Sequence, residues 1–151
     1  MNTARFADVL ASAYLRTKGS RPTPAEARVF RQWLATQFNR IRGIVDFTPD
    51  EVSPEQMTLV HAITGRLLIS TAHNVHPHWL PVENAQFRAV HDWHHISGGH
   101  GFDLMGELGA YQEARSTAPQ EIWWILHSEI LLQAAAAIRC GCFQRQKLVR
   151  L

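Results

Sequence analysis

The residues whose spacing most strongly predicts chemistry are His91 and His95, four positions apart. They belong to a cluster, because seven of the nine histidines lie between His73 and His100. On a helix, residues four apart are separated by about 40° around the axis and roughly 6 Å along it, so both imidazoles would share one face. Two imidazoles placed in this way can bind one metal ion.

Two carboxylates extend this predicted site. Glu107 follows the histidine pair after a glycine-rich segment, and we predict that it is the third metal ligand. Glu129 lies in an apolar segment, where a buried carboxylate needs a partner. We therefore predict that Glu129 either binds the metal as a fourth ligand or orients a histidine. An open coordination position would carry a water molecule whose pKa the metal lowers.

Three further side chains are candidates for proton transfer. Asp92 adjoins the first predicted ligand and is the predicted general base. His94 and His100 are second choices, either as ligands or as proton shuttles. In the alternative interpretation, the histidines only cap and cross-link helices through hydrogen bonds. We favour the metal site, because carboxylates accompany the histidine pair.

The remaining histidines are predicted to have structural or solvent-exposed roles. His61 falls in an expected helix, where a packing role is favoured over a ligand role. Residues 73–81 contain two prolines and should form a loop, and we interpret its histidines as ordinary loop residues.

The segment His91-Asp92-Trp93-His94-His95 resembles the zinc-peptidase motif His-Glu-x-x-His, in which a more distant glutamate is the third ligand. It departs from that motif at Asp92, whose side chain is one methylene shorter, and no strand that could hold a peptide is visible. Proteolysis is therefore not favoured. The following glycine-histidine run resembles the metzincin extension, but His100 is one residue early for the third ligand.

A second resemblance covers roughly the C-terminal half of the chain. Residues 84–92, Phe102 to Glu107 and Ser128-Glu129 look like a family of uncharacterised phage and bacterial proteins. These proteins carry a His-Asp-x-x-His element followed by a Gly-Glu pair. The resemblance implies a site at these residues but no particular reaction.

The pattern of apolar residues and helix caps predicts an all-α, single-domain bundle of about six helices. The expected helices cover residues 3–17, 23–43, 53–71, 82–97, 103–116 and 119–140. The last is apolar almost all round between Ile122 and Ile138, which predicts a central position in the bundle. Residues 44–47 form an extended connector without a visible partner.

Three parts of the single domain 1–151 can be distinguished. Residues 1–43 form an N-terminal helical pair, residues 53–142 carry the predicted metal site, and residues 143–151 form a basic tail that we expect to be solvated. The N-terminal pair could imitate a helix-turn-helix, but its arginines are scattered, so a packing layer is favoured.

Composition narrows the classes of function. An apolar fraction of 46% and a charged fraction of 19% are typical of a globular protein. The net charge of +2 makes a nucleic-acid partner unlikely, and no membrane span or signal peptide is expected. Cys140 and Cys142 are too close in sequence for an unstrained disulfide, which favours a reducing, cytoplasmic location.

These observations predict a metal-dependent enzyme, most simply a hydrolase with a small-molecule or unknown substrate and with zinc favoured over iron. One alternative is a non-haem iron site for oxygen chemistry, because two histidines and one carboxylate suit it. Glu129 would also allow a two-metal site, although the usual Glu-x-x-His pairs are missing. Another alternative is a non-catalytic, phage-type interaction protein with a structural histidine cluster. The run Ala134 to Ala137 would allow close packing with this chain or with a second copy.

Overall fold

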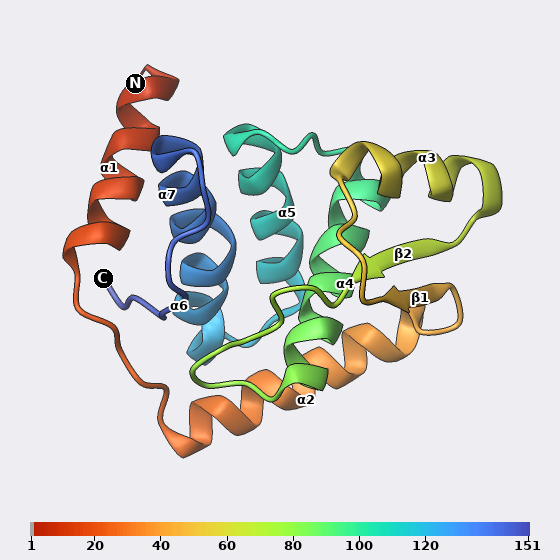
Figure 1. The fold of residues 1–151 in the computed structure, drawn as a ribbon. Coiled ribbons are helices and arrows are strands. Elements are labelled where there is room, and N and C mark those ends of the chain that lie inside the picture. Colours follow the sequence, from red (N-terminus) through yellow and green to blue (C-terminus); the bar gives the residue numbers. More distant parts are fainter. Residues whose placement is uncertain (1) are drawn as a thin grey trace.

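The computed structural model describes residues 2–151 and confirms a predominantly α-helical chain (Figure 1). Its first five helices are α1 (Thr3–Arg16), α2 (Pro24–Ile41), α3 (Pro54–Thr64), α4 (Pro81–Gly98) and α5 (Leu104–Thr117). After the 3-10 turn η1 (Gln120–Ile122), the last helix comprises α6 (Trp123–Leu126), the π-helical segment η2 (His127–Leu132) and α7 (Gln133–Cys140). Two short strands, β1 (Val45–Thr48) and β2 (Leu67–Ser70), pair in parallel.

Most helix ends lie where local sequence signals predict them. The Thr23 hydroxyl accepts a hydrogen bond from the Glu26 N–H at 3.1 Å, and the Glu26 carboxylate accepts one from the Thr23 N–H. This reciprocal capping box begins α2. At the other end of a helix, Gly99 and Gly141 follow α4 and α7 with positive φ angles of 65° and 73°. Glycine adopts this left-handed conformation without a steric penalty.

The expected helix over residues 53–71 is wrong in its second half. Helix α3 ends at Thr64, because Gly65 adopts a φ of 71° and reverses the chain. Residues 67–70 then form β2, in which Leu67 and Ile69 are buried and alternate with half-buried residues. This strand is also the partner that residues 44–47 lacked in the sequence, since Val45 pairs with Leu67. Tertiary pairing therefore overrides the helical spacing of the apolar residues.

The last helix lies between α1 and α5 (Figure 1). Ile125, Leu126 and Leu132 are fully buried, whereas Ile138 near its end is 53% exposed. The sequence did not predict the π-helical segment η2 in its middle. A π turn adds a residue to the helical repeat, and such segments are frequent at functional sites.

The core is built around contacts between α2 and α4. Phe30 on α2 stacks on Trp79 with a centroid separation of 4.3 Å and contacts Phe87 on α4 at 5.7 Å. Helix α2 is therefore a packing layer, in agreement with the sequence-based interpretation. A second cluster joins α1 to α7 through Leu10, Tyr14 and neighbouring apolar side chains.

The C-terminal segment is not the solvated tail that its basic composition predicts. Leu148 and Val149 are buried, with exposed fractions of 0% and 1%. The Val149 N–H donates a hydrogen bond to the Ser128 hydroxyl at 2.8 Å, and the Ser20 N–H donates one to the Leu148 carbonyl at 2.7 Å. The basic residues and glutamines around Leu148 and Val149 give no local indication of this docking. Within residues 2–151, no helix has the length and apolarity that crossing a membrane requires.

Candidate metal centre

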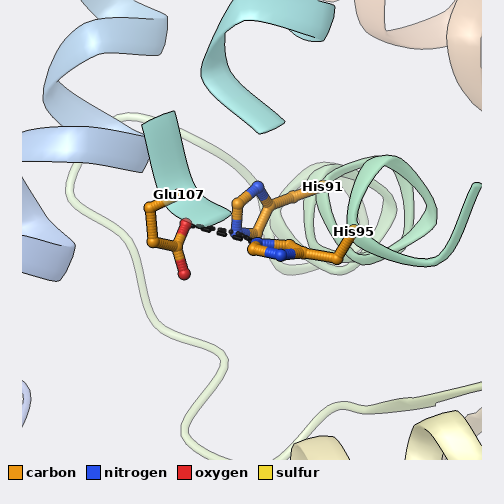
Figure 2. A group of neighbouring side chains, drawn as sticks. All are labelled: His91, His95 and Glu107. Carbon is orange, nitrogen blue, oxygen red and sulfur yellow. Dashed lines mark hydrogen bonds and ion pairs between the residues drawn. The ribbon is translucent and has the colours of Figure 1, made fainter. Parts of the chain in front are cut away.

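His91, His95 and Glu107 converge on one point between α4 and α5 (Figure 2). The His91 Nε2 lies 3.2 Å from the His95 Nε2 and 3.1 Å from the Glu107 Oε2. These three atoms form a triangle, whose third edge, from the His95 Nε2 to the Glu107 Oε2, is 3.3 Å long. Within residues 2–151, these three side chains form a group whose ligand atoms could hold a metal ion.

Local structure explains why these residues meet. Helix α4 presents His91 and His95 on one face, because they are one helical turn apart. Gly99 ends that helix, and Asp103 begins α5 by accepting a hydrogen bond from the Gly106 N–H at 2.8 Å. Glu107 therefore lies in the first turn of α5, next to the histidine pair.

The size of this triangle fits a metal ion. Ligand atoms placed about 2.0–2.1 Å from a metal are separated by about 3.3–3.4 Å in tetrahedral geometry and by about 3 Å in octahedral geometry. The three observed edges of 3.1–3.3 Å fall in this range. Moreover, the Glu107 Oε2 is buried and has no partner with hydrogen-bond geometry among residues 2–151. A cation at the centre would satisfy this oxygen and both Nε2 atoms.

The ring of His95 is oriented by the backbone. Its Nδ1 lies 2.9 Å from the Gly101 carbonyl oxygen, to which it can only donate. A neutral His95 must then present an Nε2 lone pair to the centre, as metal-binding histidines generally do. The ring is also stacked on Phe102 at a centroid separation of 4.5 Å. The side chain of His95 is fully buried, so its orientation is well defined.

Gly106 allows this orientation. A Cβ atom at this position would overlap the Gly101 carbonyl group, because the loop after α4 crosses the first turn of α5 at very short range. Sequence reasoning missed both Gly101 and Gly106 as parts of the site. The glycine-rich run between residues 98 and 109 is the signal that could have identified them.

The electrostatics of the site favour a positive charge between His91, His95 and Glu107. Burial raises the pKa of Glu107, but the close contacts and charges of His91 and His95, at 3.1 and 3.3 Å, outweigh burial and lower it to about 2. Burial would lower the pKa of His91, yet the close contact and charge of Glu107 dominate and raise it. The charge of Asp92 also contributes to this raised pKa. The group therefore stabilises a positive charge, which a divalent cation would supply.

Asp92 lies on α4 beside the first ligand and is half-buried. Burial raises its pKa, while the charges of His91 and His95 oppose the shift. A carboxylate with a raised pKa is better suited to accept a proton near neutral pH than an exposed one. Access to the centre is narrow but present, because the side chains of His91 and Glu107 are 20% and 13% exposed.

The structure does not bring the side chains of His94 and His100 into the triangle. His94 lines a separate surface cavity with residues of α2 and α5, and burial lowers its pKa to about 4. The His100 Nε2 lies 2.7 Å from the Glu113 Oε1, on the outer part of α5. His100 approaches the centre only through its backbone carbonyl, 3.3 Å from the His95 Nδ1.

Glu129 also lies outside the triangle, and its carboxylate is hydrogen-bonded to a histidine from the loop before α4. Its Oε1 is 2.7 Å from the Nε2 of His76, and the side chains of the two residues are 6% and 0% exposed. The Nδ1 of His76 accepts a hydrogen bond from the His78 N–H at 3.0 Å, so its Nε2 carries the proton that Glu129 accepts. Glu129 thus orients a histidine, but not one of the predicted ligands.

The interpretation of the loop histidines is therefore wrong for His76 and right for His73. The His73 side chain is 84% exposed, and its Nε2 lies 2.9 Å from the Oε1 of the exposed Glu51. His76 is buried and stacked on Trp79 at 5.6 Å. No local signal separates the two, because the partner of His76 lies 53 residues away in the chain. His61 packs edge-on against Trp93, in agreement with a packing role.

No protein-family model, curated protein or solved structure matches this chain.

Proposed function

We propose that the protein is a metal-dependent hydrolase, with His91, His95 and Glu107 as the metal ligands. The observation that carries this proposal is the triangle of ligand atoms with edges of 3.1–3.3 Å, one corner of which is a buried carboxylate oxygen that lacks a hydrogen-bond partner. Two histidines and a glutamate are a ligand set of catalytic zinc sites, which keep a fourth position open. Zinc is the proposed metal.

Bound zinc lowers the pKa of a water ligand and so supplies a nucleophile near neutral pH. Asp92 is the proposed general base, because it adjoins His91 and burial raises the pKa of its carboxyl group. His95 and Gly101 hold the ligand geometry. Phe87, stacked parallel to the His91 ring at 6.4 Å, and Phe102 form an apolar shell.

A second candidate is a non-haem iron site for oxygen chemistry. The ligand set favours it as well, since two histidines and one carboxylate on one face of an octahedron are typical of these iron centres. Metal identity separates the two proposals.

The test is elemental analysis of untagged protein purified without chelator or added metal. We expect about one equivalent of zinc in the wild type, and loss of that metal in His95→Ala and Glu107→Ala. His73→Ala is the matched control, because this exposed histidine lies outside the site. Less than about a tenth of an equivalent, with no tight uptake of added zinc, would overturn the metal centre.

Hydrolysis is tested separately with a panel of ester, amide and phosphoester substrates. Asp92→Asn should keep zinc but lose most turnover, by a factor of about 10² to 10⁴ for a general base. Stoichiometric iron with oxygen consumption would support the second candidate and contradict the hydrolase.

A further inference from the structure

A surface cavity of about 560 Å³ lies away from the three proposed ligands. Its walls come from the end of α1 and the connection to α2, from Pro77 and His78 in the loop before α4, and from residues 144–147 of the C-terminal segment. Small-molecule sites commonly have volumes of about 300–1,000 Å³. The docking of the C-terminal segment, which the sequence did not predict, therefore creates a cavity large enough for a ligand.

The lining of this cavity is positively charged. Arg21, Arg145 and Lys147 contribute to it, and no aspartate or glutamate lines it. Within residues 2–151, no carboxylate oxygen lies within 4.0 Å of a side-chain nitrogen of Arg21 or Arg145. By contrast, Arg150 in the same C-terminal segment is paired with Glu26 at 2.7 Å. The cavity thus gathers cations that have no anionic partner.

The wall that carries Arg145 and Lys147 is held in place by hydrogen bonds. The Tyr14 hydroxyl donates to the Arg145 carbonyl oxygen and accepts from the Lys147 N–H, both at 3.2 Å. The Lys147 Nζ donates to the Thr17 carbonyl oxygen at 2.7 Å and lies 5.2 Å from the Tyr14 ring centroid. These hydrogen bonds fix the backbone of residues 145–147 against the end of α1. A ligand would therefore not have to order this wall, which favours binding.

We propose that this cavity binds the phosphate group of a small phosphorylated ligand. Guanidinium groups bind phosphate oxygens through paired, charge-assisted hydrogen bonds, and two arginines with one lysine match the charge of a phosphate better than that of a single carboxylate. Gln144 and Gln146 supply additional polar groups in the lining. This proposal does not depend on the metal centre.

The test is calorimetric titration of the full-length protein, as purified, with inorganic pyrophosphate at about 0.15 M salt. We expect saturable binding of one pyrophosphate, and at least tenfold weaker binding by the double variant Arg21→Ala/Arg145→Ala. Both residues are exposed, so the variant should keep the wild-type circular dichroism spectrum. The matched control is Arg5→Ala/Arg28→Ala, which removes the same two charges from exposed positions on α1 and α2. It should bind like the wild type.

Three results of the pyrophosphate titrations would overturn the proposal. These are the absence of saturable binding, equal weakening in the control, and loss of binding in Glu107→Gln but not in the arginine variant. The last would place pyrophosphate at the metal centre instead. Tighter, strongly salt-dependent binding of single-stranded DNA to the same arginines would also overturn it, because the surface would then bind a nucleic-acid backbone.

Discussion

The Nδ1 of His95 donates a hydrogen bond to the Gly101 carbonyl oxygen at 2.9 Å. This bond joins the proposed metal ligand on α4 to the loop that leads into α5. It determines which nitrogen of His95 is free to bind a metal, and the loop can make it only because Gly106 has no side chain.

We therefore expect Gly106→Ala to weaken metal binding without altering any ligand. A methyl group would displace the Gly101 carbonyl and turn the His95 ring, and loss of such a supporting contact typically costs 10–100-fold in affinity. Zinc competition with a chromophoric chelator measures the change. Gly43→Ala is the control, because nothing lies within 4 Å of a Cβ at that position. Equal affinities for both variants would show that Gly106 does not support the site.

Metal affinity should increase with pH and level off above the raised pKa of His91. Burial alone would lower this pKa, but Glu107 and Asp92 raise it, so a proton competes with the metal at a higher pH than for an ordinary histidine. Zinc binding should release protons, and calorimetry in two buffers of different ionisation enthalpy measures their number. Asp92→Asn should shift the midpoint to lower pH. An affinity that is constant between about pH 5 and pH 8 would contradict this prediction.

Breaking the buried pair of His76 and Glu129 should destabilise the fold. His76→Ala leaves the Glu129 carboxylate buried without its partner, and such changes cost about 3–5 kcal/mol in the free energy of unfolding. Urea denaturation measures this difference. The exposed pair of His73 and Glu51 provides the comparison, because His73→Ala should change stability very little. Similar costs for both substitutions would show that burial of His76 is not what makes its pair important.

The docked C-terminal segment should contribute to stability. Leu148→Ala is expected to cost about 2–5 kcal/mol, because Leu148 is fully buried, whereas Leu151→Ala should be nearly neutral at 70% exposure. The midpoint of thermal unfolding shows the contrast between these matched substitutions. If the two variants unfold at the same temperature, the segment does not pack as described.

Local signals predicted much of the helical framework. The capping box at Thr23, the glycines after α4 and α7, and the spacing of His91 and His95 all act within a few residues. Such features depend on backbone geometry and on neighbouring side chains, which are already present in the sequence. The proposed ligand Glu107 could be selected because only a short loop separates α4 from α5.

By itself, the sequence determined most of the helices and their ends, and a histidine pair on one helical face. The tertiary structure decided which groups complete that pair, since Gly101 and Gly106 act through a close crossing of loop and helix. It also decided the partner of Glu129, the pairing of β1 with β2 and the burial of Leu148. These contacts join residues far apart in the chain, and their free energy comes from burial that no local pattern records.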